Sequence, residues 1–220
     1  MLKKLSKILI SLCLFPLLFS CTVVRHDDDQ KEEGGVTFYF ESEDFDAASF
    51  IKECWDARIV PEIKENAVDL NFLMVSLRRD QDETIEKHGI RKEESSPFSF
   101  IVKGNIPIKS INQESAAGLL ALDTPDLRGN EYCQIQIGPV IKKSAVRDAL
   151  SFINFGDFAN QIEFANISRE INFYIRDHVV STLGDDVPEN SSAEFFGVFI
   201  LDGTGSIIIT PVILIIHPGE

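Results

Sequence analysis

The sequence predicts an α+β fold, in which a helical hairpin packs on a small antiparallel, OB-like β-barrel with a helix before the last strand pair. Three observations favour this fold. Apolar residues recur at helical spacing before residue 92 and alternate at strand spacing from Phe98 onward. A second helical pattern follows these strands, and two apolar runs joined by a glycine-containing turn come last.

The sequence of residues 1–20 is typical of a signal peptide. Three lysines up to Lys7 precede the apolar run 8–19, which is too short to cross a bilayer. The run ends in L-F-S-C, a pattern that resembles the bacterial lipobox, in which the cysteine is lipidated and begins the mature chain. We therefore predict a lipid anchor on Cys21. An ordinary secretory signal followed by a chance cysteine is the alternative.

The charge excludes one class of partner. The net charge is −14, and removal of residues 1–20, with their three lysines and no acid, would bring it to −17. An acidic exported chain lacks the basic surface that nucleic acids require. Residues 21–35 form an acidic tether that cannot bury surface, so the lipid must provide the membrane attachment. No aspartate follows Cys21, and the membrane that holds the anchor stays open.

We expect residues 36–220 to form one domain, with a helical entry over 36–92 and the barrel with its inserted helix over 93–220. The apolar run 36–40 forms a short strand or packs on the first helix. An aspartate at position 44 or 46 caps that helix.

Three helices are expected in the entry. The first ends near Arg58, and Pro61 starts a second, whose apolar stripe continues to Leu77. A third, short helix ends at His88 and is closed by the glycine that follows.

Strands are predicted from residue 98 onward. Gly104 and Pro107 indicate a bulge or a sheet edge, and Gly138 with Pro139 should end the last strand before the helical insertion. Residues 125–130 contain the turn before that strand. The predicted strands of this part are 98–102, 106–111, 118–123 and 131–141.

The insertion and the last strand pair complete the chain. Residues 143–151 form a short helix or turn, Asp157 caps a helix over 158–165, and Ser168 caps a further helix. Runs 194–201 and 206–216 form a hairpin. The second run is nearly unbroken in its apolar character, so both of its faces should be covered.

The cysteines leave two alternatives. Once Cys13 is removed and Cys21 is lipidated, Cys54 and Cys133 remain. An exported compartment permits a disulfide between them, but their positions on a helical apolar face and in a strand pattern favour burial as two small apolar residues. Neither they nor the four histidines have metal-ligand spacing, so we predict no metal site and no cofactor.

The sequence lacks the familiar catalytic and phosphate-binding motifs, and we predict a protein that is not an enzyme. Polar residues instead gather between positions 137 and 172. Gly138 and Pro139 have a structural role. A guanidinium beside a carboxylate, with two amides nearby, suits recognition of hydroxyl groups or a peptide backbone, and the alternative is a buried polar network between barrel and helix. The candidate binding residues are Arg147, Asp148, Asp157, Asn160 and Gln161.

The same stretch resembles the bacterial predicted periplasmic lipoproteins of domain of unknown function 2291. The family pattern contains G-P-V-I, then R-D-A-L, and then D-F-x-N-Q-I-E. Residues 142–144 and Ser151 depart from it. The matching residues are Gly138, Pro139, Val140, Ile141, Arg147, Asp148, Ala149, Leu150, Phe152, Asp157, Phe158, Asn160, Gln161, Ile162 and Glu163.

This resemblance covers most of the mature chain and implies a role in the cell envelope. Members are often encoded beside sugar ABC-transporter subunits, which implies an accessory role in sugar uptake. We therefore expect a lipid-anchored protein that faces the periplasm or the exterior and contacts such subunits. A sugar-like small-ligand module built on residues 138–163 is the alternative.

Overall fold

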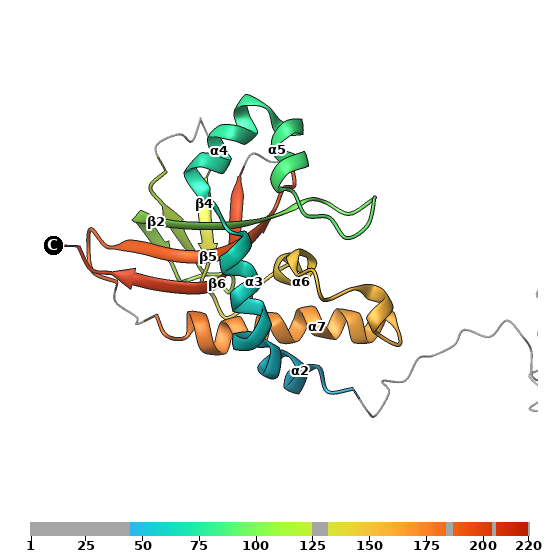
Figure 1. The fold of residues 1–220 in the computed structure, drawn as a ribbon. Coiled ribbons are helices and arrows are strands. Elements are labelled where there is room, and N and C mark those ends of the chain that lie inside the picture. Colours follow the sequence, from blue (N-terminus) through green and yellow to red (C-terminus); the bar gives the residue numbers. More distant parts are fainter. Residues whose placement is uncertain (1–44, 125–131, 184–186, 204–205, 220) are drawn as a thin grey trace, which may run out of the picture. The chain divides into compact units, whose positions relative to one another are not determined.

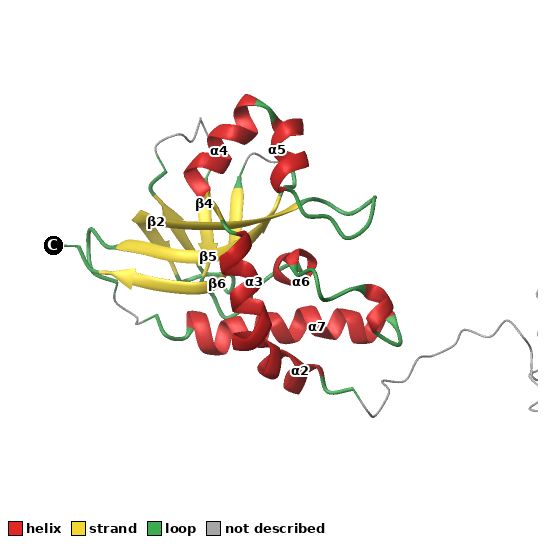
Figure 2. Ribbon diagram, in the orientation of Figure 1, coloured by secondary structure: helices red, strands yellow, loops and turns green. Residues whose placement is uncertain are grey.

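The computed structural model describes residues 45–124, 132–183, 187–203 and 206–219 (Figure 1). Within this part, a curled sheet is flanked by helices on one side and at one end (Figure 2). The expected strand over 36–40 and the expected turn over 125–130 lie outside the described residues. The main strands of the sheet are β2 (Ser99–Asn112), β3 (Leu119–Leu122), β4 (Cys133–Gln136), β5 (Ser192–Ile200) and β6 (Ile207–His217).

These five strands form a closed barrel with the strand order of an OB-fold. The order is β2-β3-β4-β6-β5, and pairing between β2 and β5 closes it. The predicted α+β class with an OB-like barrel is therefore confirmed. One pair, β4 with β6, is parallel, which the expectation of an antiparallel barrel did not include. An odd number of strands cannot close with every neighbouring pair antiparallel, so one parallel pair is required.

β2 is one bent strand where two runs were predicted. Its first part pairs with β5, from Ser99 opposite Ile200 to Pro107 opposite Ser192. Its second part pairs with β3, and the register shifts between Ile108 and Ser110. The predicted bulge thus lies just after Pro107, where the strand exchanges one partner for the other.

The first helix passes through Pro61 without a break. α2 (Ala47–Cys54) continues as a π-helical turn (Trp55–Ile59) and then as α3 (Val60–Asn66). Proline has no N–H for an α-helical hydrogen bond, and the wider turn before it, closed by the amide of residue 60 donating to the carbonyl of residue 55, accommodates it. Pro61 therefore lies in the first turn of α3, as predicted, but α3 continues from α2 and is not a separate helix.

The predicted second helix is instead interrupted by β1 (Val68–Asp69), which pairs in parallel with β2. Asp69 then caps α4 (Leu70–Arg79), its carboxylate accepting from the amide of Phe72 at 2.9 Å. A helical pattern alone could not reveal this break, because it depends on a strand distant in sequence. α5 (Gln81–His88) ends at His88, as predicted.

The insertion between β4 and β5 holds α6 (Ala145–Ala149), a 3₁₀ turn (Phe155–Asp157) and α7 (Gln161–Tyr174), which continues into a second π-helical turn (Ile175–Val180). α7 packs against α2 (Figure 1). The helix before the last strand pair is confirmed, but its predicted caps were wrong. Asp157 lies in the 3₁₀ turn, and Ser168 lies inside α7.

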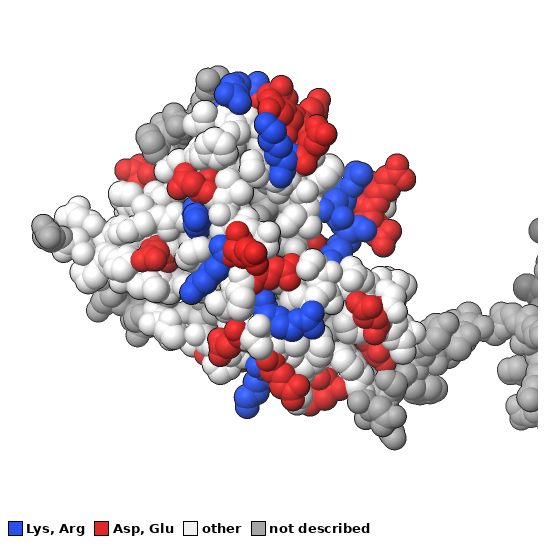
Figure 3. Space-filling model, in the orientation of Figure 1, with Lys and Arg blue, Asp and Glu red and all other residues white. Residues whose placement is uncertain are grey.

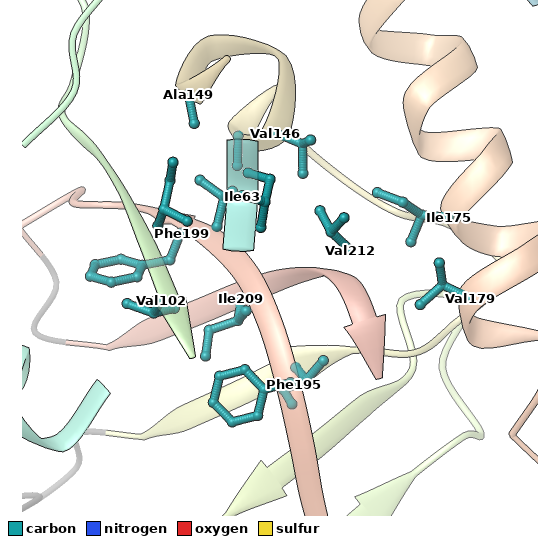
Figure 4. Packing of buried hydrophobic residues seen from close by; sticks show 14 of the residues in the cluster. Ile63, Val102, Val146, Ala149, Ile175, Val179, Phe195, Phe199, Ile209 and Val212 are labelled. Atoms are coloured by element: carbon teal, nitrogen blue, oxygen red, sulfur yellow. The ribbon is translucent and has the colours of Figure 1, made fainter. Parts of the chain in front are cut away.

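The barrel and helices share one hydrophobic core, in which Ile63, Val146 and Ile175 come from helices and Phe199 and Val212 from strands (Figure 4). The central part of β6 is covered on both faces as predicted, since residues 209–212 are buried in succession, whereas Ile215 near its end is 47% exposed. Within the described residues, no helix is long and apolar enough to cross a membrane.

Both remaining cysteines are buried free thiols, so the possible disulfide does not form and the alternative of two small buried residues holds.

Candidate functional site

The Gly138-Pro139 loop lies against the turn between β2 and β3. The amide of Gly138 donates to the carbonyl of Ala117 at 3.1 Å, and that of Val140 donates to the carbonyl of Ala116 at 3.0 Å. A β-carbon on Gly138 would lie 2.2 Å from the carbonyl carbon of Ala117. Only glycine fits here, and the loop leaves Pro139 and Val140 exposed.

A buried glutamine holds the other end of this loop. Gln136 donates to the Thr210 hydroxyl at 2.8 Å and to the carbonyl of Lys142 at 3.3 Å. Its oxygen accepts from the amide of Lys142 at 2.8 Å. The amide side chain therefore bridges β4, β6 and the loop, a role that its sequence position inside a strand did not indicate.

Arg147 and Asp148 do meet, as a half-buried pair that joins α6 to α7. Nε and Nη2 of Arg147 donate to one carboxylate oxygen of Asp148 at 2.8 and 2.7 Å. Nη1 donates to the carbonyl of Phe164 at 3.2 Å, and the guanidinium carbon lies 3.9 Å from the centre of that ring. The Ser144 hydroxyl donates to the second Asp148 oxygen at 2.5 Å. With this pairing, only 14% of the Arg147 side chain is exposed.

The other candidates lie at the start of α7. Oδ1 of Asn160 accepts from the amides of Ile162 and Glu163, each at 2.9 Å, and Glu163 accepts from the amide of Ala159 at 3.0 Å. Asn160 thus caps α7, but Glu163 accepts from the residue before the cap and not from the cap's own amide, so this is not the reciprocal capping box that Asn154 and Asp157 form in the preceding 3₁₀ turn. The sequence signal, an asparagine three residues before a glutamate, was present, although the cap was assigned to Asp157.

The five candidates therefore do not converge on one site. Asp157 accepts from the amide of Asn154 at 3.0 Å within the 3₁₀ turn, and Gln161 is exposed on the first turn of α7. Of the other four, Arg147 connects α6 to α7 through the carbonyl of Phe164. The hydrogen bonds of Asp148, Asp157 and Asn160 lie within their own segments. A binding role for the five residues stays a prediction.

A hollow of about 180 Å³ lies beside the Arg147–Asp148 pair and includes a residue that sequence reasoning missed. Lys92 comes from the linker before β2, and its ammonium donates to the carbonyl of Leu150 and to Oδ1 of Asn154, the latter at 3.3 Å. No local pattern could place it there, because its partners are about sixty residues away. The hollow is lined by Lys92, Glu93, Ser96, Arg147, Asp148, Asn154, Phe155 and Phe164.

A second concave region, the outer groove, lies between the Pro139–Ile141 segment and the solvent-facing side of α7 and has a volume of about 430 Å³. Val140 and Phe173 line it, with exposed fractions of 46% and 41%. Ile162, Arg169 and Phe173 lie on one outward stripe of the helix, because they are spaced by seven and four residues. The guanidinium of Arg176 stacks on Phe173, 4.6 Å from the ring centre.

The described residues contain no group of three or more histidine, cysteine or acidic side chains placed to hold a metal ion. The family model of the predicted periplasmic lipoproteins of domain of unknown function 2291 matches residues 11–215. The chain belongs to this family. As a predicted periplasmic lipoprotein, it is a lipid-anchored protein of the cell envelope. The identity of Cys21 as the anchored residue lies outside the described residues and stays a prediction.

Among solved structures, this predicted periplasmic lipoprotein is similar to an OB-fold protein from Thermotoga maritima determined by crystallography. The TM-score is 0.62 at 17% sequence identity, over 79% of this chain and 99% of the other. At this identity the likeness establishes the fold alone. A search of curated proteins gave no match.

Proposed function

We propose that this lipoprotein is a non-enzymatic accessory of a sugar ABC uptake system and that it contacts a subunit of that system through the outer groove. The observation that carries the proposal is the exposure of Val140 and Phe173 on the two walls of this groove. Large apolar side chains left in solvent next to one another are characteristic of surfaces that another protein covers.

The position of the groove within the family pattern supports this choice. Val140 lines the groove, and Ile162 lies on the same outward stripe of α7 as Phe173 but outside the lining of the groove. They belong to the G-P-V-I and N-Q-I-E elements, yet 46% and 43% of their surfaces are exposed. The glycine and asparagine of these elements have visible structural roles in the loop and the helix cap. Packing within the chain does not account for the two exposed apolar side chains, whereas contact with a partner does.

The choice of partner rests on the membrane anchor and on the implied genomic neighbourhood of the family. A lipid anchor keeps the protein beside integral membrane subunits, which raises their effective concentration for one another. Charge alone would select a partner poorly, because basic and acidic side chains are interspersed over the face shown in Figure 3. Shape and apolar contact in the outer groove would provide the selection.

The small-ligand alternative has less support. Arg147 and Asp148 line a hollow of about 180 Å³, whereas binding pockets for small molecules typically measure about 300–1,000 Å³. Three nitrogens of Arg147 already donate within the chain. These bonds use three of the five N–H groups of the guanidinium, which leaves fewer donors for a sugar.

The test is mild crosslinking and affinity purification of the anchored protein from solubilised membranes. Phe173→Asp places a charge in the outer groove, and Phe72→Asp places the same charge on α4, where the phenylalanine is 57% exposed. Both sites are exposed, so both variants should fold with stabilities close to that of the native protein.

Recovery of sugar-binding or permease subunits with the native chain and Phe72→Asp, but not with Phe173→Asp, is the expected result. Equal recovery with all three would remove the outer groove from the contact. If none of the three recovers such a subunit, the accessory role itself falls.

A further inference from the structure

Lys92 is a half-buried cation whose charge is not compensated at short range. Within the described residues it forms no ion pair, and both of its hydrogen-bond acceptors, the Leu150 carbonyl and the Asn154 amide oxygen, are neutral. Lysine is seldom withdrawn from solvent unless an anion accompanies it. Lys92 has therefore exchanged part of its hydration for contacts with two neutral acceptors.

The neighbouring charges do not provide a contact partner. Asp148 accepts two bonds from Arg147 and one from Ser144, so its charge is already compensated. Burial has the largest effect on the pKa of Lys92 and lowers it, and the charge of Arg147 lowers it further, while Glu62, Asp148 and Asp157 raise it without forming an ion pair with the ammonium. The ammonium has thus lost hydration without gaining a contact anion.

We propose that the hollow beside Lys92 binds a single carboxylate group, with Lys92 as its ion-pair partner. The Ser96 hydroxyl lines the same hollow and can donate a second hydrogen bond. Phe155, half of whose surface is exposed, forms an apolar wall for the carbon atoms next to the carboxylate. A volume of about 180 Å³ suits a small carboxylate. Glu93 and Asp148 also line the hollow and repel any anion, so the ion pair with Lys92 must provide the attraction, and a ligand with more than one negative charge is disfavoured.

A carboxylate can come from a free small acid or from an acidic side chain of a partner protein. The hollow and the outer groove are lined by different residues, so this inference does not rest on the proposed function. The experiment has one arm for each source.

The first arm titrates the isotope-labelled full chain with sodium acetate, at an ionic strength kept constant with sodium chloride, and follows the Lys92 ε-carbon signal by NMR. Saturable shifts, with a rise in the pKa of Lys92, are expected. Lys92→Gln should bind acetate about tenfold more weakly, Lys92→Arg should retain binding, and Lys87→Gln, which changes an exposed lysine of α5, should bind as the native chain does.

The second arm repeats the crosslinking with Lys92→Gln and Lys92→Arg. Suppose that acetate does not bind the native chain, that Lys92→Gln no longer recovers the partner and that Lys92→Arg still does. This result identifies a carboxylate of the partner protein as the occupant. The proposal is overturned if acetate fails to bind the native chain and Lys92→Gln still recovers the partner. It is also overturned if acetate binds native chain and Lys92→Gln equally. If acetate also fails to bind, recovery with Lys92→Gln but not with Phe173→Asp would leave the proposed function standing while this site falls.

Discussion

The thiol of Cys133 stays protonated at pH values well above neutrality. Only 1% of its surface is exposed, and burial raises the pKa of the thiol from 9.0 to about 12. Because the thiolate is the reactive form, the side chain should resist alkylation and disulfide exchange in the folded protein.

The raised pKa of Cys133 also gives a pH dependence. Its contribution to stability is complete below about pH 9, where both states hold the proton, and is lost as the pH rises toward 12. Over that window the native chain should lose about 1.4 kcal/mol per pH unit more than Cys133→Ala does. Urea unfolding of both chains between pH 8 and pH 10, that is from about one unit below to one unit above the ordinary thiol pKa, measures this difference. Equal changes in the free energy of unfolding of the two chains over this pH range would contradict the prediction.

Gly138 gives a second prediction at the residue scale. Gly138→Ala should lower the free energy of unfolding by about 2–3 kcal/mol, because its β-carbon would overlap the backbone of Ala117. Gly156→Ala is the matched control, since no atom lies within 4 Å of a β-carbon built there. Chemical denaturation of both variants decides the matter, and equal stabilities would mean that the loop shifts freely.

At the scale of the element, the cap of α7 is open to test. Asn160→Ala should cost about 1 kcal/mol, because two amide groups of the first turn lose their acceptor. Asn160→Asp keeps an acceptor and should cost less. Gln161→Ala, at an exposed position of the same turn, should change stability by less than about 0.5 kcal/mol in the same thermal or urea unfolding series.

Two pairs of adjacent Arg and Asp residues, one in α6 and one in the π-helical turn after α7, show how burial affects the strength of an ion pair. Arg147→Ala should destabilise the protein by about 2 kcal/mol, because it leaves Asp148 half-buried without its partner and removes the contact with Phe164. Arg176→Ala breaks the equivalent pair with Asp177, but both of those side chains are well exposed, and the expected cost is below about 0.5 kcal/mol. Similar losses in both variants would show that burial does not strengthen the first pair.

How far these elements were predictable depended on the range of the interactions that form them. The strand alternation around Phe100 and the turn after β5 are local signals, and they led to the correct barrel. The break at Val68 was missed because it comes from pairing with Val102. The π-helical turn before Pro61 was missed because a proline is also compatible with a helix start.

The candidate site was less predictable than the fold. Its residues were identified by type, but type does not say whether an amide caps a helix or faces a ligand. Lys92 and Gln136 owe their roles to partners 58 and 74 residues away, respectively, which no local pattern contains.

For the molecule as a whole, attachment to the membrane is a separate property from folding. Cys21→Ser should move the protein from the membrane fraction to the soluble fraction of the envelope, because the predicted acyl acceptor is lost. The barrel should retain its melting temperature, since the described residues, which begin at Phe45, belong to one compact unit. If Cys21→Ser is still found in the membrane fraction, another segment provides the anchor.

Closure of the barrel has a consequence for crowding. A strand at the border of an open sheet offers unpaired amides and carbonyls to any neighbouring chain, and lipid anchoring gathers many copies into a thin layer where such encounters are frequent. Here β2 and β5 join the ends of the sheet. The closed arrangement gives adjacent molecules little backbone on which to polymerise, so the protein can be held densely at a surface and still remain dispersed.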